Sequence, residues 1–490
     1  MSTRSIQEIR ALFDVTEVTS ARDEINGILG QIFNPRRAFH ASSERVNLAL
    51  NSAAPASLAE VVREVSAKII PRSVHYRHKW AMAHMVPPPA VIAIIGDLFV
   101  SALNQCAFIW EEAPVAAELE KEVLRWMAAK LKLSSQSQGL LTTGGTVSNY
   151  LAMILAKQHS DRCNKTDSER LCAVVSDQSH LSILRAIRLI GLPDTALIRV
   201  ATNQEGRVAS GQIVETTMQL LRAGKIPFLF VCTAGTSNGG VMEDASEFLA
   251  ASQRCRAWCH VDAAHGGAVC LRNGSLGTAS RWPLADSVSW DPHKSLYVPY
   301  SLGALFVKSP ESLDVLRVTS EYALKPEMAH RNNDVGTKHF YTSRRLDALK
   351  LWMTIRHFGD SGFETITSHC FDLAMALAKL VNESPDLELH THPDTNIVCF
   401  RFVSAECNER ELNELNSVIQ AKLFAIGGPL FSSTRINGVT YLRAVLLNPL
   451  LEVSDLKRAL DEARKIAAGE VNSAITSSSH ESTPCYQPAS

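Results

Sequence analysis

Long runs of one kind of residue are missing from this sequence of 490 residues. No apolar run reaches the length of about 20 residues that a membrane-spanning helix needs. The formal net charge is -1 and no long basic run is present, which excludes the electrostatic footprint of a nucleic-acid binder or of a polybasic membrane binder. We therefore expect a small molecule as the partner, and neither nucleic acid nor a membrane.

A targeting signal is missing from the first fifteen residues, MSTRSIQEIRALFDV. They contain no charged segment followed by an apolar core and a small-residue cleavage site. This composition predicts a soluble, cytoplasmic protein.

Paired cysteines are missing as well, because the 11 cysteines are odd in number and scattered. Cys255 and Cys259 do not form a CxxC pair with a second pair downstream, so a zinc site is not favoured and we expect no metal. Several cysteines lie inside apolar, strand-like runs, where reduced and buried thiols are more typical than disulfides; these are Cys172, Cys232, Cys259 and Cys399.

The pattern of apolar residues divides the chain into four parts. Residues 1–90 read as helices with loops and end at the proline run Pro87–Pro89. Residues 91–360 alternate short apolar runs with helix-length segments, which is typical of a mostly parallel sheet covered by helices. Residues 361–469 give the strand, helix, strand pattern of a smaller α+β lobe, and residues 470–490 are rich in Ser and Thr and are predicted to be disordered.

The short apolar runs predict the strands of the large domain. They are Leu171 to Ser176, Ala196 to Val200, Pro227 to Cys232 and Ala257 to Val261. In an open parallel sheet, ligands bind outside the carboxyl ends of the strands. Polar residues that directly follow an apolar run are therefore the first candidates for a functional site.

The first candidate is the stretch LTTGGTVSN, residues 141–149, which precedes a helical pattern. Glycines followed by hydroxyls at a helix start present free N–H groups to an anion, and the helix dipole adds to the attraction. This pattern favours a phosphate site, and the alternative is a Gly-rich turn with a Ser or Thr helix cap. No GxxxxGK[ST] pattern is present, so a nucleoside triphosphate is disfavoured.

Two further candidates follow other apolar runs. Asp262 ends the run in AWCHVDAAHGG, where a buried carboxylate needs a cation or several donors; the alternative is a cap of the following turn. Lys294 ends the stretch ADSVSWDPHK, and a lysine that loses its water in a cleft becomes a usable nucleophile. Its alternative interpretation is a solvated loop residue.

Together, a phosphate cradle, a buried carboxylate and a lysine on successive strands are the parts needed to hold pyridoxal phosphate. The glycine-rich turn would take the phosphate. Asp262 would keep the pyridine nitrogen protonated, and Lys294 would form the internal aldimine.

At these residues the chain resembles the group II pyridoxal-phosphate-dependent amino-acid decarboxylases, which include the glutamate, aromatic amino-acid, cysteine-sulfinate and diaminobutyrate decarboxylases. The resemblance covers about residues 70 to 450. Its motifs are Asp291-Pro-His-Lys294, His260-Val-Asp-Ala-Ala264, Thr143-Gly-Gly-Thr146, Ala234-Gly-Thr236, Ser179-His180, Asn104-Gln105 and Glu112-Ala-Pro114. It implies an α/β fold of type I, the aspartate-aminotransferase type, with a large seven-stranded, mostly parallel sheet, a smaller C-terminal lobe, and a homodimer whose sites lie at the subunit interface.

The resemblance also implies roles for single residues. Lys294, Asp262 and His180 would be catalytic, with His180 stacked on the pyridine ring. The residues implied to contact the cofactor are Gly145, Thr146, His180, Thr233, Asp262, Ala264, Asp291, His293 and Lys294. Arg443 would bind the substrate carboxylate, or else belong to a buried ion pair. His84, in AMAHM, occupies a position that the family uses to contact substrate, and this stretch looks most like the diaminobutyrate branch.

One position departs from the family. The expected reaction passes through an external aldimine and a quinonoid that must be protonated at Cα, and in many members a loop tyrosine supplies the proton. Here the best-matched position is Asn333, and an amide is no general acid near neutral pH. The residues that could stand in are Tyr322, Tyr341, His330 and His339. His265, where relatives commonly carry an aromatic residue, is a second departure and a further possible acid.

Three functions follow from this sequence. The first is decarboxylation of an L-amino acid. The second is a redirected outcome at the same site, such as oxidative deamination to an aldehyde or joining to another electrophile, because of Asn333. The third is a non-catalytic binding protein, against which the presence of both Lys294 and Asp262 argues.

Overall fold

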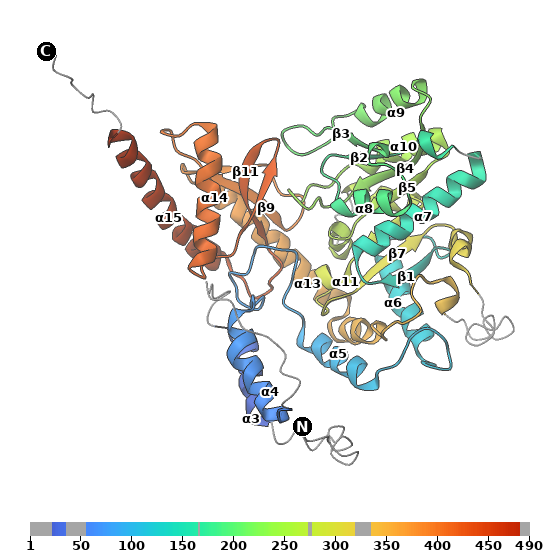
Figure 1. Cartoon of the computed structure of the whole chain (residues 1–490), viewed down its shortest axis with the longest axis horizontal. Helices are drawn as coiled ribbons and strands as arrows, with labels where there is room; N and C mark the ends of the chain where they lie inside the picture. Colours follow the sequence, from blue (N-terminus) through green and yellow to red (C-terminus); the bar gives the residue numbers. More distant parts are fainter. Residues whose placement is uncertain (1–21, 36–54, 165–166, 273–276, 319–334, 481–490) are drawn as a thin grey trace.

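The computed structural model describes residues 22–35, 55–164, 167–272, 277–318 and 335–480 (Figure 1). A larger lobe and a smaller lobe lie side by side, and the N-terminal segment runs beneath both. Within these residues no helix is long and apolar enough to span a membrane.

The large lobe is built on a sheet with the strand order β1-β7-β6-β5-β4-β2-β3. Only β7 runs against the others, because its pairings with β1 and β6 are antiparallel and the remaining pairings are parallel. The strands are β1 Gln138–Thr142, β2 Leu171–Ser176, β3 Leu197–Val200, β4 Ile226–Thr233, β5 Trp258–Asp262, β6 Ser287–Trp290 and β7 Gly303–Val307. This confirms the predicted seven-stranded, mostly parallel α/β sheet.

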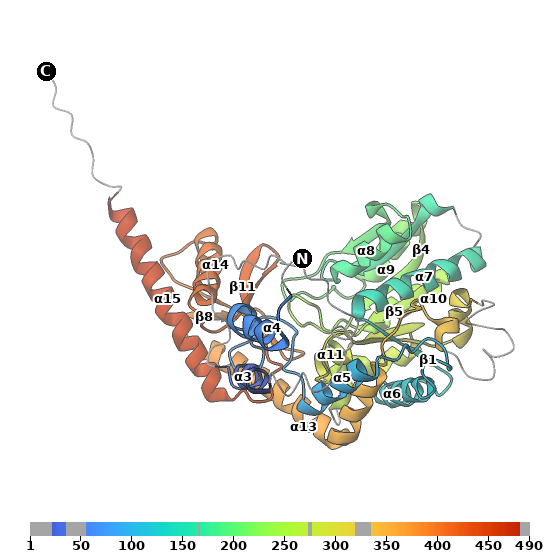
Figure 2. The same cartoon turned by 60° about the horizontal axis from the view of Figure 1, so that its bottom comes forward.

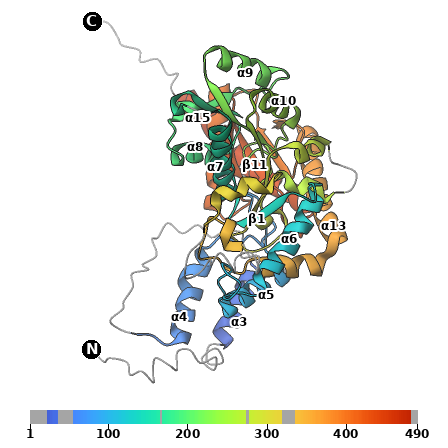
Figure 3. The same ribbon diagram turned by 90° about the vertical axis from the view of Figure 1, so that its right-hand side faces the viewer.

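The apolar runs of the sequence predicted four of these strands with errors of no more than one residue at either end. Such runs identify strands well because helices cover both faces of the sheet (Figure 3). On one face, α7 and α8 pack against the strands. The other face is covered by α6, α9, α10 and the start of α13. The helices are α6 Ala116–Lys130, α7 Gly145–Asn164, α8 Leu181–Leu189, α9 Gln212–Arg222, α10 Ala245–Cys255 and α13 Ala348–Asn382.

The alternation of side chains along β5 matters for the site. Cys259 and Val261 belong to the apolar core with α6 and α10. His260 and Asp262 point to the opposite face, where both contact Asn149 of α7. A polar stripe therefore lies under α7 in an otherwise apolar sheet.

The small lobe is an antiparallel sheet in the order β10-β11-β9-β8, covered on one face by α14, α15 and the second half of α13 (Figure 2). The other face turns toward the large lobe, where Cys399 Sγ lies 3.2 Å from the Asn238 carbonyl oxygen. Its elements are β8 Leu387–Leu389, β9 Ile397–Phe402, β10 Ser432–Ile436, β11 Val439–Val445, α14 Glu409–Ala425 and α15 Val453–His480.

Helix α13 joins the two lobes. The sequence predicts two helices here, at 345–357 and 363–383, and the structure has two helical halves that meet in a kink at Gly359, whose φ is 62°. Glycine adopts this left-handed conformation without a steric penalty. The boundary predicted at residue 360 lies beside this kink.

The C-terminal prediction needs a correction. Disorder was expected from residue 470, but α15 continues to His480. No glycine or proline stands between Glu470 and His480 to end the helix. The rest of the predicted tail, 481–490, lies outside the described residues.

The N-terminal segment packs along the small lobe and reaches the junction of the two lobes. Its helices are α3 Arg22–Phe33, α4 Leu58–Glu64 and α5 Val91–Leu103. Between α4 and α5 the chain follows the small lobe: the Met82 N–H donates to the Leu430 carbonyl at 3.1 Å, and the Val445 N–H donates to the Met82 carbonyl at 2.7 Å. These bonds bring His84 and Met85 to the junction of the lobes.

Candidate active site

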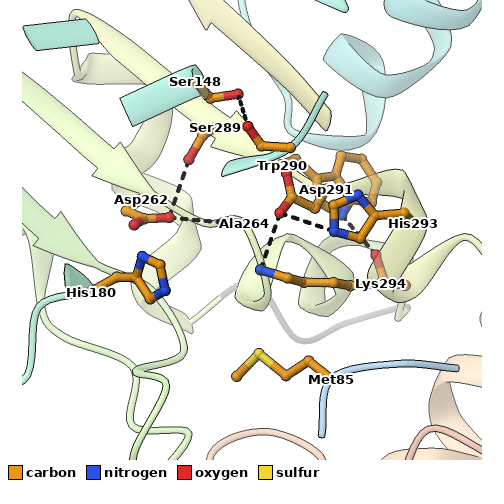
Figure 4. Close-up of polar contacts among 12 residues, drawn as sticks. Met85, Ser148, His180, Asp262, Ala264, Ser289, Trp290, Asp291, His293 and Lys294 are labelled. Carbon is orange, nitrogen blue, oxygen red and sulfur yellow. Dashed lines mark hydrogen bonds and ion pairs between the residues drawn. The ribbon is translucent and has the colours of Figure 1, made fainter. Parts of the chain in front are cut away.

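Lys294 lies on α11 (Pro292–Ser295), a single helical turn that follows β6. Its Nζ is 3.1 Å from Oδ2 of Asp291, and Nε2 of His293 is 3.6 Å from the same oxygen (Figure 4). The Asp291 side chain is 1% exposed, whereas that of Lys294 is 19% exposed. The lysine amine is therefore held at the edge of the sheet, with one side open.

Asp262 lies at the end of β5 and accepts three hydrogen bonds. Oδ1 accepts from the Ala264 N–H and from Oγ of Ser289, both at 3.2 Å, and Oδ2 accepts from Nδ2 of Asn149 at 2.6 Å. Burial acts to raise the pKa of the Asp262 carboxyl, but His260, the Asn149 bond and the Lys294 charge together bring that pKa below its usual range. Asp262 thus has the donors that a buried carboxylate requires.

His180 caps α8, where its Nδ1 accepts from the Ser182 N–H at 3.2 Å. In Figure 4 its ring lies between Asp262 and the space in front of Lys294. Burial lowers the pKa of His180; the Asp262 charge opposes this shift, and the charge of Lys294 acts in the same direction as burial. The imidazole is therefore neutral near pH 7.

The glycine-rich turn leads directly into α7, which begins at Gly145. A Cβ at Gly145 would stand 2.9 Å from Cβ of Ala264 and 3.1 Å from Oδ2 of Asp291, and one at Gly144 would stand 3.0 Å from Cε1 of His293. The backbone is thus packed too closely for side chains at these positions. N–H groups in the first turn of a helix have no partner within it, so this turn fits a phosphate group.

Thr233 ends β4 in register with Asp262. Its Oγ1 is 3.2 Å from Oγ of Ser179, the residue before His180, and its N–H donates to Oε2 of Glu243 at 2.7 Å. Burial raises the pKa of Glu243 to about 7. The strand order brings Thr233, His180 and Asp262 to the same edge of the sheet.

Arg443 and His84 come to the site from the other side, on β11 and on the N-terminal segment. Nη1 of Arg443 donates to the Ala83 carbonyl at 3.0 Å and to Oγ of Ser432 at 3.2 Å. Arg443 is 7% exposed, and within the described part of the chain no carboxylate forms an ion pair with it. Burial and the Arg443 charge lower the pKa of His84.

The structure gives different outcomes for the candidate proton donors. Tyr322, His330 and Asn333 lie outside the described residues. Nδ1 of His339 accepts from the Tyr341 N–H at 3.0 Å, and its Nε2 donates to the Leu141 carbonyl at 2.6 Å. Burial lowers the pKa of His339 to about 3, so His339 carries no transferable proton near neutral pH.

Tyr341 and His265 are the two remaining candidates. The hydroxyl of Tyr341 is 2.9 Å from Oγ1 of Thr143, in the glycine-rich turn. Nε2 of His265 is 2.9 Å from Oδ1 of Asn396, and burial lowers the pKa of His265 to about 3. His265 is therefore neutral as well, which is against a role as an acid at neutral pH.

Asn149, Ser182 and Ser289 also contribute to the site, although no sequence motif predicted a role for them. The sequences of β5 and β6 contain a pattern that could have indicated Ser289. Both strands are apolar except at alternate positions, and the parallel register pairs His260 with Ser287 and Asp262 with Ser289. Among the described residues, no group of three or more His, Cys, Asp or Glu side chains is arranged to hold a metal ion.

Comparison with known proteins gives a family match and curated relatives. The pyridoxal-dependent decarboxylase conserved domain matches residues 43–403. An L-2,4-diaminobutyrate decarboxylase of Rhizobium meliloti is 29% identical over 408 residues, covering 82% of this chain and 81% of that protein. A phenylacetaldehyde synthase of Arabidopsis thaliana is 28% identical over 418 residues, covering 83% and 85%.

A solved structure has the same fold. It is the glutamate decarboxylase domain of a diaminobutyrate-pyruvate transaminase and L-2,4-diaminobutyrate decarboxylase from Vibrio parahaemolyticus, with 25% identity, a TM-score of 0.80, and coverage of 92% of this chain and 95% of that one. The fold, the lysine and acid at the strand ends, and the family match over most of the chain agree. The chain belongs to the pyridoxal-dependent decarboxylase family and is a pyridoxal-phosphate-dependent carboxy-lyase that acts on an amino acid.

Proposed function

We propose that the substrate is a short L-amino acid with a second amino group, such as L-2,4-diaminobutyrate, and that the product is the corresponding amine. The observation that supports binding of an amino-acid α-carboxylate is the buried guanidinium of Arg443, which has neutral acceptors but no carboxylate partner among the described residues. A buried cation of this kind gains most from an incoming carboxylate. The side-chain class rests on the AMAHM stretch and on the diaminobutyrate decarboxylases among the relatives.

The residues present fit the cofactor. Lys294 would hold it covalently through Nζ, Asp262 would accept a hydrogen bond from the protonated ring nitrogen, and the N–H groups at Gly145 and Thr146 would bind its phosphate. His180 and Ala264 would pack on the two ring faces, with Thr233, Asp291 and His293 at the edges. When bound, pyridoxal phosphate accepts the electron pair that remains as carbon dioxide leaves Cα.

The protein would supply orientation and charge. Arg443, reached from β11, would hold the α-carboxylate of the substrate. Met85, which faces Lys294 across the site (Figure 4), would help to exclude water, as apolar side chains at a reacting centre do. His84 is next to Met85 and would contact the substrate. The ionised Asp262 would hold the protonated ring nitrogen through a charge-assisted hydrogen bond.

A substrate panel tests this proposal. The purified, cofactor-loaded enzyme would be incubated with 2,4-diaminobutyrate, ornithine, glutamate, cysteine sulfinate, tyrosine and tryptophan, and products identified by mass spectrometry. Release of 1,3-diaminopropane at a higher kcat/KM than any other amine supports the assignment. Preferred turnover of an aromatic or acidic substrate would overturn the proposed substrate class and leave the decarboxylase family unchanged.

A second outcome is favoured by Asn333, and phenylacetaldehyde synthase is among the relatives. Here the amino acid, O₂ and water would give the aldehyde, carbon dioxide, ammonia and hydrogen peroxide. Following dissolved oxygen and peroxide during the same incubations separates the two outcomes, since amine release consumes no oxygen. If the aldehyde dominates, Asn333→Tyr should increase the amine fraction.

We also propose that the enzyme acts as a homodimer. One face of α5 exposes five large apolar side chains at helical spacing; these are Val91, Ile95, Leu98, Phe99 and Leu103. In the N-terminal segment, no residue of α4 is buried, and Val61 and Leu29 are also exposed. A second copy of the chain would cover this face. The cytoplasmic location expected from the sequence remains a prediction.

A further inference from the structure

A continuous line of buried polar side chains runs behind Asp262, from the sheet through α7 to α8. Its hydrogen bonds are Trp258 Nε1 to Ser287 Oγ at 2.8 Å, Ser287 Oγ to His260 Nδ1 at 2.8 Å, His260 Nε2 to Asn149 Oδ1 at 2.9 Å, Asn149 Nδ2 to Asp262 Oδ2 at 2.6 Å, Asn149 Nδ2 to Ser182 Oγ at 2.9 Å, and Ser182 Oγ to His180 Nδ1 at 2.7 Å. Apart from His180, each residue in this line is at most 5% exposed. Water therefore competes little for these bonds.

The chemistry of Trp258 and Asp262 determines which atom donates in each hydrogen bond of the line. The indole of Trp258 can only donate, and the ionised carboxylate of Asp262 can only accept. Asn149 must turn its nitrogen to Asp262, because its oxygen there would face another acceptor. The Asn149 oxygen then faces Nε2 of His260, so that nitrogen carries the proton.

The bonds from His260 through Ser287 to Trp258 are consistent with this assignment. His260 accepts at Nδ1 from the Ser287 hydroxyl, which in turn accepts from Trp258. Burial lowers the pKa of His260 to about 4. A neutral His260 with one donor nitrogen and one acceptor nitrogen satisfies both neighbours.

The second branch leads to His180. The other N–H of Asn149 donates to Oγ of Ser182, which leaves the Ser182 hydroxyl proton for Nδ1 of His180. The backbone N–H of Ser182 also donates to this nitrogen, at 3.2 Å. Because two donors meet Nδ1, the proton of the neutral His180 ring must be on Nε2.

We propose that Asn149 is a positioning residue whose amide nitrogen both orients the Asp262 carboxylate and, through Ser182, fixes His180 as its Nε2–H tautomer. The inference rests on the proposed roles of Asp262 and His180 toward the cofactor. One side chain would thus set two contacts of the cofactor ring, the acceptor at its nitrogen and the imidazole on its face. Neither contact is independent of the other.

The first test uses the cofactor-free protein labelled with ¹⁵N-histidine. Two-bond ¹H–¹⁵N correlations distinguish the two imidazole tautomers, and His180→Gln and His260→Gln assign the signals. Both histidines should be neutral Nε2–H tautomers at pH 7. Ser182→Ala, which leaves the Asn149 to Asp262 bond intact, should mix the tautomers of His180 alone. A charged His180 at this pH, or an Nδ1–H tautomer, would overturn the proposal.

The second test measures binding of pyridoxal phosphate and the absorbance spectrum of the bound cofactor against pH. Asn149→Ala should weaken cofactor binding about tenfold or more, the cost of losing a hydrogen bond to a buried charge. It should also move the acid-side pH midpoint of the spectrum upward, because Asp262 takes up a proton more readily without this donor. Ser182→Ala should leave that midpoint in place.

Two variants control for damage to the fold. Asn416→Ala removes an equally buried amide from the small lobe, where its Nδ2 donates to the Phe402 and Leu412 carbonyls. Ser160→Ala removes a buried α7 hydroxyl for which the described part of the chain offers no hydrogen-bond partner. If Asn149→Ala shifts the spectrum no more than Asn416→Ala does, the inference is wrong. If the wild-type protein binds no pyridoxal phosphate, the proposed function fails instead, and the tautomer measurement still decides the network.

Discussion

Nζ of Lys294 and Oδ2 of Asp291 lie 3.1 Å apart, at opposite ends of one helical turn. Asp291 is almost fully buried, and its Oδ1 has no hydrogen-bond partner among the described residues. The lysine is therefore held by a carboxylate at the same edge of the sheet where Asp262 ends β5. This arrangement fixes the starting position of the amine that the proposed mechanism uses.

Replacing this amine should remove the covalent link to the cofactor. In Lys294→Ala, decarboxylation should fall by about a thousandfold or more, because no other amine takes the nucleophile's place. After borohydride reduction of the wild-type enzyme, mass spectrometry should find the cofactor on the peptide that contains Lys294. Lys308→Ala, which removes a lysine that donates to the Leu284 carbonyl, should still give the labelled Lys294 peptide. Modification of another lysine would refute the assignment.

The guanidinium of Arg443 should act on substrate binding. Arg443→Gln is expected to raise KM about tenfold to a hundredfold, since it removes a charged hydrogen bond to the substrate carboxylate. Cofactor binding should change much less. Arg401→Gln is a matched control on the neighbouring strand β9, because Arg401 is also buried but pairs with Glu388 and Glu409. Equal effects of the two variants on KM would mean that Arg443 has only a structural role.

The buried His339 should make folding stability depend on pH. Its pKa in the folded state is lowered to about 3, so below about pH 6.5 the unfolded chain binds a proton that the folded chain does not. Stability is therefore lost as the pH falls, by about 2 kcal/mol between pH 7 and pH 5 for this residue.

Urea unfolding of the wild type and of His339→Gln at pH 7 and pH 5 measures this loss. A glutamine amide can still donate to the Leu141 carbonyl that His339 contacts, but it does not titrate. The variant should lose about 2 kcal/mol less than the wild type between the two pH values. An equal loss in both proteins would contradict a neutral, buried His339.

The apolar face of α5 should determine the oligomeric state. Leu98→Glu would place a charge where a second chain is proposed to pack, since the Leu98 side chain is 63% exposed in the single chain. Light scattering after gel filtration should then report a monomer, against a dimer for the wild type. Leu189→Glu changes an equally exposed leucine on α8 and should stay dimeric. A monomeric wild type would reject the dimer.

Short sequence patterns were enough to predict several strands and part of the candidate site. The strands of the large lobe followed from apolar runs, because a covered sheet must bury both faces of each strand. Lys294 and Asp262 were found because each follows such a run, where parallel strands end together. The glycine-rich turn was found because a helix start offers unpaired N–H groups. Each of these signals lies within about ten residues of chain.

The tertiary structure decided what depends on partners distant in sequence. Asn149 and Asp262 are 113 residues apart and become hydrogen-bonded only when α7 lies across β5. Whether Arg443 has a carboxylate partner, and whether His339 has a free nitrogen, likewise depends on which segments meet around them. A hydrogen bond needs a donor and an acceptor about 3 Å apart, and one sequence supplies the residue types but not that distance.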